Sequence, residues 1–298
     1  MNHRLGYIGL GIMGRPMATH LIQAGYPLYV WARREETIAP LVAIGATACD
    51  SAAAVAQHAD IVFTNVSDTQ DVEQVVLGDR GILEGANSGC IVIDNSTISP
   101  KATRAIAERL RQRDIDMLDA PVSGGEQGAI AGTLSIMVGG RAEVFERALP
   151  FLKLIGKNIV HVGHHGAGQV AKTCNQVVVA MTIAAVGEAM VVAEASGVDP
   201  AKVREALMGG FANSKILEVH GQRMLDNNFA PGFKAKLHRK DMGIALQTAA
   251  ELGIALPGAA LVAQLINALV GHGGGELDSS AIVKMQRLLA SIDPKTQG

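Results

Sequence analysis

A chain of 298 residues is long enough for about two domains, and its 48% hydrophobic content can bury a large core. The 26 basic and 28 acidic residues leave a formal net charge of −2, which argues against a nucleic-acid partner held by bulk charge. Three widely separated cysteines match neither a disulfide framework nor a zinc site, so we expect no metal and a reducing, cytoplasmic setting. Residues 1–4 lead directly into a strand-like run, and we expect no signal peptide.

Strand-like runs alternate with helical patterns in the first half of the chain. The apolar run ending at Gly9 predicts a strand, and residues 13–24 predict the helix that follows it. Further strand-like runs cover residues 28–31, 60–64, 90–94, 115–119, 134–138 and 158–162. The helical patterns between them include residues 71–76 and 100–113. This alternation predicts an α/β fold, with a Rossmann-type, doubly wound parallel sheet in a dinucleotide-binding domain of residues 1–165.

The remaining residues, 166–298, predict an all-helical domain for substrate binding and oligomerisation. Residues 169–195 form one long pattern that is apolar on most faces, as in a helix buried all round. Its most apolar run, residues 177–187, is shorter than the ~20 residues that span a bilayer, so no membrane partner is expected. Further helices are expected from residue 200 and over residues 214–226, 237–252, 257–270 and 280–291, with a glycine-rich loop at 271–275. So much apolar surface on one helix favours a homodimer or homotetramer.

A glycine-rich turn joins the first strand to the first helix. It consists of Gly9, Leu10, Gly11, Ile12, Met13 and Gly14. G-x-G-x-x-G in this strand-to-helix context is typical of dinucleotide-binding domains. Gly9 allows the tight turn, Gly11 lets the backbone approach a pyrophosphate, and Gly14 allows close packing of helix and strand. A glycine turn without a ligand is the alternative, which the context disfavours.

The end of the second strand predicts the choice of cofactor. An acidic residue at this position binds the ribose 2′-hydroxyl of NAD. This chain has Ala32 there, followed by Arg33 and Arg34. Because arginine makes forked hydrogen bonds to phosphate, the pattern favours NADP(H), with NAD(H) as the alternative. Two arginines that are simply solvated, or that stack on the adenine, would explain the pattern without a phosphate.

A lysine and an asparagine stand close together at the start of the long helix. Lys172 and Asn175 are i and i+3 on a helix, so they share a face within a largely apolar segment. Burial favours the neutral form of a lysine, which suits proton transfer, whereas a snorkelling lysine would have no chemical role. Cys174 points elsewhere on the helix and is expected to pack in the core. The histidines of residues 161–165 are expected to be loop residues and not metal ligands.

Four motifs in order carry a family resemblance over nearly the whole chain. They are residues 9–17, 119–125, 166–176 and 240–241. With these motifs the chain resembles the β-hydroxyacid dehydrogenases, the family of 3-hydroxyisobutyrate dehydrogenase and tartronate semialdehyde reductase (2-hydroxy-3-oxopropionate reductase). Residues 209–221 are most similar to the tartronate semialdehyde reductases of glyoxylate metabolism. The resemblance implies an NAD(P)-dependent oxidoreductase that reduces tartronate semialdehyde to glycerate, with 3-hydroxyisobutyrate or another short 3-hydroxyacid as the alternative substrate.

The resemblance also implies roles for individual residues. Lys172 would be the general acid in reduction and the general base in oxidation. A small carboxylate substrate would be bound by Ser123, Gly124, Gly125, Asn175 and Lys240, the last lying over the site from the helical domain. Besides the glycine turn and the two arginines, cofactor contacts would come from Val66, Asp71, Thr97 and Lys240.

Two other classes of protein share this scaffold. A dinucleotide-binding module without catalysis, or an imine reductase, is expected to lack the lysine, and Lys172 is present. Relatives often carry Met-Leu-Pro after the strand that corresponds to residues 60–64, where this chain has Asn65-Val66-Ser67. The polar pair Asn213-Ser214 in the helical domain predicts a substrate that carries an extra hydroxyl.

Overall fold

The computed structural model describes residues 3–292, which form two compact units. The first unit ends at Lys172 and the second begins at Thr173, both within helix α9 (Ala167–Ala195). The division therefore lies a little further along the chain than the predicted boundary after residue 165. The reason is that the first turns of α9 hydrogen-bond to the sheet domain, as described below.

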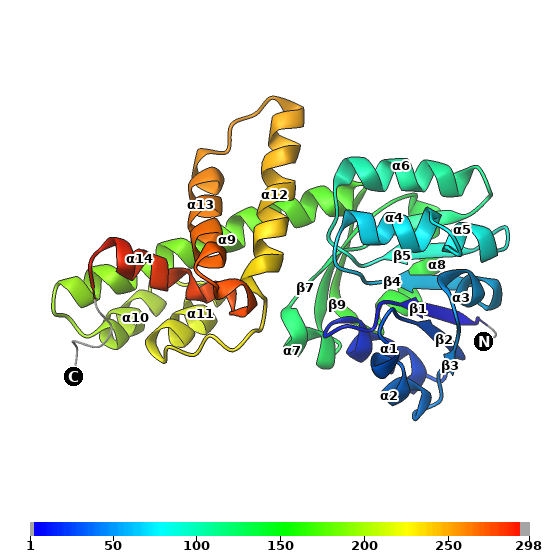
Figure 1. The fold of residues 1–298 in the computed structure, drawn as a ribbon, viewed down its shortest axis with the longest axis horizontal. Coiled ribbons are helices and arrows are strands. Elements are labelled where there is room, and N and C mark those ends of the chain that lie inside the picture. The colour runs from blue at the N-terminus through cyan, green and yellow to red at the C-terminus, as the bar shows by residue number, and fades with distance from the viewer. Residues whose placement is uncertain (1–2, 293–298) are drawn as a thin grey trace. The chain divides into compact units, whose positions relative to one another are not determined.

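Within the described residues, nine strands of the first unit form one sheet in the order β3-β2-β1-β4-β5-β6-β8-β7, with β9 paired to β8 (Figure 1). Strands β1 to β6 pair with one another in parallel, and β8 runs antiparallel to β6 and β7. The strands are β1 (Leu5–Ile8), β2 (Leu28–Trp31), β3 (Thr47–Ala48), β4 (Ile61–Thr64), β5 (Ile91–Asp94), β6 (Asp116–Asp119), β7 (Val122–Ser123), β8 (Leu134–Gly139) and β9 (Gly156–Gly163). The order reverses between β1 and β4, which is where ligands bind in doubly wound sheets. The predicted Rossmann-type sheet is confirmed.

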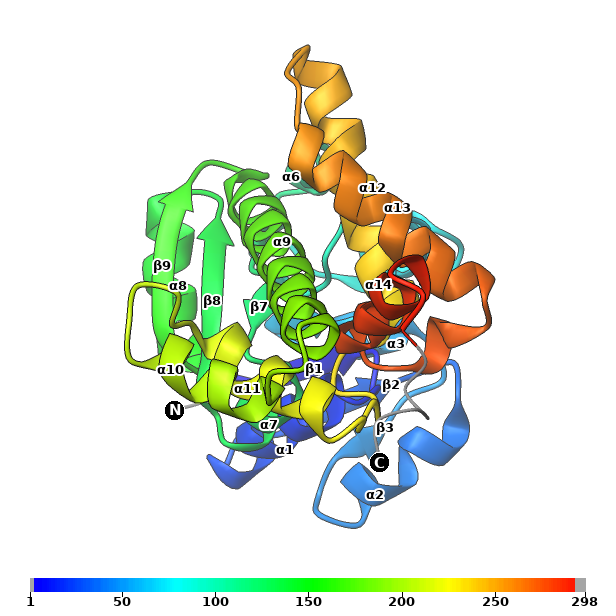
Figure 2. The ribbon, with the colours of Figure 1, turned by 90° about the vertical axis from the view of Figure 1, so that its left-hand side faces the viewer.

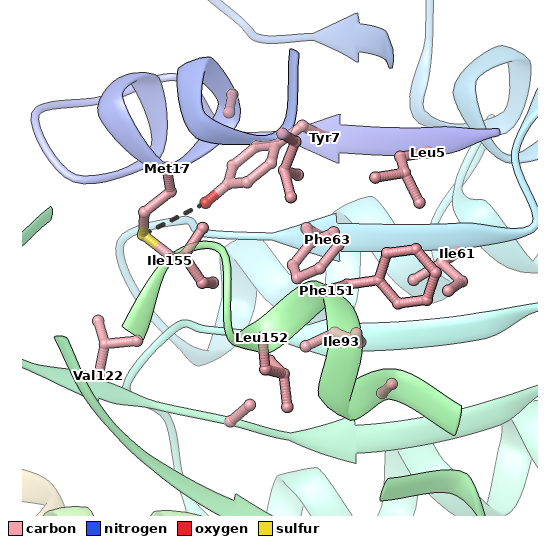
Figure 3. Close-up of a cluster of buried hydrophobic side chains, with 14 of the residues drawn as sticks. Leu5, Tyr7, Met17, Ile61, Phe63, Ile93, Val122, Phe151, Leu152 and Ile155 are labelled. Carbon is pink, nitrogen blue, oxygen red and sulfur yellow. Dashed lines mark hydrogen bonds between the residues drawn. The ribbon is translucent and has the colours of Figure 1, made fainter. Parts of the chain in front are cut away.

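Alternate residues of the central strands face two different helical layers. Tyr7 and Phe63 belong to a cluster shared with α1 and α8, whereas Ile8 and Val62 belong to one shared with α3, α4 and α6. Figure 3 shows the first cluster, where the rings of Tyr7 and Phe63 stack at 5.8 Å and the Tyr7 hydroxyl donates to Met17 Sδ at 3.5 Å. The helices are α1 (Gly14–Gln23), α2 (Ala39–Val42), α3 (Ala52–His58), α4 (Thr69–Leu77), α5 (Ile82–Gly85), α6 (Pro100–Arg111), α7 (Gly125–Ile130) and α8 (Ala142–Leu152). Both faces of the sheet are thus covered, which explains its nearly continuous apolar strands.

The second unit is helical throughout its described part. After α9 it contains α10 (Pro200–Met208), α11 (Lys215–Leu225), α12 (Ala235–Leu252), α13 (Pro257–Gly271) and α14 (Val283–Leu289). Helices α12 and α13 lie side by side in both views of the ribbon (Figures 1 and 2). The single helix predicted over residues 280–291 is instead a 3₁₀ turn, Ser279–Ile282, followed by α14. The Asp278 side chain accepts from the backbone N–H of Ser280 and from its hydroxyl, which tightens this turn.

Two expectations about helix α9, its burial on all sides and the packing of Cys174 in the core, are contradicted by the structure. One face carries fully buried residues such as Ile183 and Met190, but Val178 and Val192 on the opposite face are 63% and 64% exposed. The expected burial on all sides is therefore wrong for the single chain. Cys174 is also exposed and does not pack in the core, because it lies away from the face that buries Lys172. By length and composition α9 could span a bilayer, although 44% of its most apolar window is buried.

Candidate active site

Four neighbouring strands end in one row at the edge of the sheet. Ile8 of β1 is level with Thr64 of β4, which is level with Asp94 of β5, and Asp94 is level with Asp119 of β6. The loops that follow these strands therefore leave the sheet at the same edge. Trp31 of β2 is also level with Ile8, and the candidate residues of the first unit lie in the segments that follow these five strands and in the first turns of α9.

The glycine turn has the geometry that a dinucleotide phosphate requires. Gly9 has a φ of +94°, and a Cβ there would lie 2.2 Å from the carbonyl oxygen of Asn65. A Cβ on Gly14 would lie 2.0 Å from the Gly9 carbonyl oxygen. At Gly11 a Cβ would meet nothing within 4 Å, so the backbone here borders open space. Because none of the described side chains caps α1, its N–H donors fit a pyrophosphate in that space.

The other residues of the turn differ in exposure. Leu10 is buried in the core beneath the turn, whereas the Ile12 side chain is 49% exposed. Met13 is partly buried and packs against the core on the α1 side of the sheet. Leu10 and Met13 therefore anchor the turn, and Ile12 faces outward.

The arginine pair after β2 lies in a charged environment. Arg33 Nη1 is 2.8 Å from Asp71 Oδ1, and Arg33 Nη2 donates to Asp71 Oδ2 at 3.2 Å. Arg34 Nε is 4.0 Å from Glu36 Oε1, and both of these side chains are largely exposed. Two predicted cofactor residues, Arg33 and Asp71, are therefore bound to each other.

A hydrogen-bonded network fixes the loops that follow β4 and β5. Thr64 Oγ1 donates to Asp94 Oδ1 at 2.8 Å, and the backbone N–H of Ser96 donates to the same oxygen at 3.1 Å. Ser96 Oγ in turn accepts from the backbone N–H of Val66 at 2.9 Å. Val66 is thus held in place although the Met-Leu-Pro of many relatives is missing. Thr97, which follows Ser96 in the chain, is partly exposed at the same edge of the sheet.

The catalytic candidate Lys172 lies against the turn that is expected to bind a carboxylate. Its side chain is buried, with 7% exposure, and Nζ donates to the carbonyl oxygen of Val122 at 2.8 Å. Val122 directly precedes Ser123, Gly124 and Gly125. The two glycines have φ angles of +136° and +61°, and both are exposed. The structure thus brings the lysine and the serine-glycine turn together.

Two residues that sequence reasoning missed hold the start of α9. Asp119 accepts from the backbone N–H of Gly166 at 2.8 Å and of Gln169 at 3.0 Å, so it caps the helix from strand β6. The Gln169 side chain donates to the Ser96 carbonyl at 2.8 Å and accepts from the backbone N–H of Ile98 at 3.1 Å. Burial raises the pKa of Asp119 to about 6, although the two N–H donors oppose this rise. Both residues lie within the motifs that carry the resemblance, but no local capping rule pairs residues this far apart.

The remaining candidates form a chain of polar contacts within the helical unit. Asn175 Nδ2 donates to Gln176 Oε1 at 2.8 Å, and Gln176 Nε2 donates to Asp241 Oδ2 at 2.6 Å. Lys240 Nζ is 3.0 Å from Asp241 Oδ1, and its side chain is 24% exposed. Gln176 and Asp241 therefore connect Asn175 to Lys240, two residues that were predicted separately as substrate ligands. The predicted place of Lys240 over the substrate stays a prediction.

The polar pair Asn213-Ser214, which predicted a hydroxyl-bearing substrate, lies at the start of helix α11. The Ser214 hydroxyl caps α11 by accepting from the backbone N–H of Leu217 at 3.0 Å. Asn213 is exposed beside this cap. The pair therefore gives no support to the choice of substrate.

Two family models together match most of the chain. Residues 4–163 match the NAD binding domain of 6-phosphogluconate dehydrogenase, and residues 166–286 match the family described as NAD-binding of NADP-dependent 3-hydroxyisobutyrate dehydrogenase. The chain is also 48% identical over 292 residues to 2-hydroxy-3-oxopropionate reductase of Escherichia coli, with 97% of this chain and 98% of that protein covered. The chain belongs to the 3-hydroxyisobutyrate dehydrogenase family.

Further members support this assignment. The chain is 38% identical to 3-hydroxyisobutyrate dehydrogenase of Pseudomonas aeruginosa, covering 95% of this chain and 98% of that protein. The structure of Mycobacterium tuberculosis 3-hydroxyisobutyrate dehydrogenase with L-serine matches with a TM-score of 0.89 at 31% identity, covering 96% of this chain and all of that one. As a member of the 3-hydroxyisobutyrate dehydrogenase family, the protein is an NAD(P)-dependent oxidoreductase. The resemblance inferred from its motifs is confirmed.

Proposed function

We propose that this dehydrogenase reduces 2-hydroxy-3-oxopropionate (tartronate semialdehyde) to glycerate, with Lys172 as the general acid. The observation that carries the proposal is the buried Lys172 ammonium, held 2.8 Å from the Val122 carbonyl at the start of the Ser123–Gly125 turn. A proton donor is thus placed beside hydroxyl and backbone N–H donors that suit a carboxylate. The relative that is 48% identical is named for this substrate.

The chain's own residues would divide the work as follows. The hydride for the reduction comes from the bound nicotinamide. Ser123 Oγ and the N–H groups of Gly124 and Gly125 would bind the substrate carboxylate. Lys172 Nζ would donate a proton to the aldehyde oxygen as negative charge develops there, and in the oxidation it would take that proton back. Asn175, which follows on α9, would orient the neighbouring substrate oxygen through its amide.

We further propose that NADP(H) is the favoured cofactor. Ala32 stands where an acidic residue would select NAD(H), and the guanidinium groups of Arg33 and Arg34 follow it. NAD(H) is the alternative, and a comparison of kcat/KM for NADPH and NADH distinguishes the two.

A second candidate function is the interconversion of 3-hydroxyisobutyrate and methylmalonate semialdehyde. Two family members named for 3-hydroxyisobutyrate, at 38% and 31% identity, favour it. The two substrates differ in whether the central carbon carries a hydroxyl or a methyl group. A steady-state screen of short 3-hydroxyacids and their semialdehydes, run with both cofactors, tests the proposal against this alternative.

We also propose that the protein assembles as a homodimer or homotetramer through its helical unit. Support comes from exposed apolar side chains of α9 and α13, where Val178, Val192 and Leu261 are each more than 60% exposed. Burying such residues between copies of the chain is favourable because it removes apolar area from water.

A further inference from the structure

An ion pair crosses the sheet edge beside the glycine turn. Strands β2 and β4 flank β1, so the segments that follow them border the turn that leaves β1. Arg33 follows β2, and Asp71 lies in the first turn of α4, which follows β4. Their side chains meet in two parallel contacts of 2.8 and 3.2 Å, the fork geometry of an arginine-carboxylate pair. The guanidinium expected to receive a 2′-phosphate is therefore already bound to a carboxylate.

Asp71 is the fixed member of this pair. Its backbone N–H donates to the Asp68 side chain at 2.9 Å, and its own side chain is only 20% exposed. The position near the N-terminus of α4 also favours its negative charge. The Arg33 side chain, by contrast, is 68% exposed on a long flexible stem. A ligand that binds Arg33 must therefore draw the guanidinium away from Asp71 or share it.

We propose that Asp71 determines the selectivity between NADP(H) and NAD(H), because its carboxylate competes with a ribose 2′-phosphate for Arg33. The inference rests on the proposed function only in taking the cofactor to bind with its ribose beside Arg33. NADP(H) must break the ion pair and bring its phosphate close to a second negative charge, which opposes binding. NAD(H) carries a hydroxyl at this position, and a carboxylate can accept a hydrogen bond from it. Asp71 thus lowers the preference for NADP(H) that Arg33 alone would produce.

The variant Asp71→Asn tests this inference through cofactor binding. It removes the charge and keeps the size of the side chain, and the cap from Asp68 uses the backbone N–H, which is unchanged. We expect the Kd for NADPH to fall about threefold to tenfold, and the Kd for NADH to stay within about twofold, as for the loss of an exposed fork-shaped pair. The Kd values are measured from nicotinamide fluorescence during titration without substrate. The gain for NADPH is expected to shrink at high salt.

Two further variants make the test specific. Glu73→Gln removes an exposed negative charge two positions further along α4, outside the Arg33–Asp71 ion pair, and it should leave the ratio of the two Kd values unchanged. Arg33→Ala should weaken NADPH binding, and adding Asp71→Asn to that variant should tighten it clearly less than Asp71→Asn does when Arg33 is present.

Three outcomes would overturn the inference. They are an unchanged ratio of Kd values in Asp71→Asn, an equal loss of affinity for both cofactors, and the same gain for NADPH with and without Arg33. A wild-type protein that prefers NADH refutes only the proposed cofactor preference, because the shift caused by Asp71→Asn is read from binding alone. Failure to reduce 2-hydroxy-3-oxopropionate likewise leaves the shift measurable.

Discussion

Removal of the Lys172 ammonium should abolish most turnover and leave cofactor binding intact. In Lys172→Ala and in Lys172→Met the substrate oxygen loses its proton donor, and a positioned acid or base contributes about 10²–10⁴ in rate. At 1.36 kcal/mol per tenfold, this corresponds to about 3–5 kcal/mol of transition-state stabilisation. Because Nζ also binds the Val122 carbonyl, the unpaired carbonyl would lower the free energy of unfolding by about 1–3 kcal/mol. Methionine fills most of the space of the lysine stem, so Lys172→Met separates the lost proton donor from a lost side chain.

The assay is steady-state oxidation of NADPH with 2-hydroxy-3-oxopropionate, together with the Kd for NADPH and the thermal midpoint of each variant. Small primary amines added to Lys172→Ala should restore part of the turnover, which a purely structural role would not allow. Lys157→Ala, on an exposed position of β9, is the matched control and should behave as the wild type. Turnover of Lys172→Met within a few-fold of the wild type would refute the assignment of Lys172 as general acid.

Three other predictions follow from the site and the surface. Arg33→Ala should raise the KM for NADPH more than the KM for NADH, and an equal effect on both would show that Arg33 does not bind a 2′-phosphate. Asp119 has a raised pKa of about 6 in the fold, so its contribution to stability is present below about pH 4 and is lost as the pH rises through about 6. We therefore expect the free energy of unfolding of the wild type, relative to that of Asp119→Asn, to fall by about 1–3 kcal/mol between pH 4 and pH 7, as measured by denaturant unfolding. A rise over this range would mean that the two N–H donors lower the pKa of Asp119 by more than burial raises it. Light scattering at micromolar concentration should give two or four times the monomer mass of 31.1 kDa, and the monomer mass itself would contradict the proposed assembly.

The sequence was most informative where a strand is buried on both faces. Continuous apolar runs such as residues 91–93 of strand β5 leave few alternatives, and the predicted parallel sheet is present. The two-residue strand Val122–Ser123 could not be predicted, because two residues carry no periodicity. The prediction of a single helix over residues 280–291 was wrong because Asp278 tightens the residues that follow it into a 3₁₀ turn. The apolar spacing of this segment alone fits one helix.

At the candidate site, sequence reasoning identified the chemical groups but not what holds them. The Lys172 motif and the serine-glycine turn were both visible, and the structure places them together at the Val122 carbonyl. Asp119, which caps the start of α9, lies 47 positions before Gly166, and such a long-range cap leaves no local signal in the sequence. The pairing of Arg33 with Asp71, 38 positions apart, was hidden for the same reason, although each residue had been linked to the cofactor separately.

The most direct test of the proposed function compares two substrates that differ only at the central carbon. A site that hydrogen-bonds a substrate hydroxyl rejects the analogue without it, because its own buried polar groups are then left unpaired. Rates of NADPH oxidation by the wild-type protein should give a kcat/KM for 2-hydroxy-3-oxopropionate at least about tenfold above that for methylmalonate semialdehyde. An equal or higher kcat/KM for methylmalonate semialdehyde would contradict the account and assign the protein to 3-hydroxyisobutyrate.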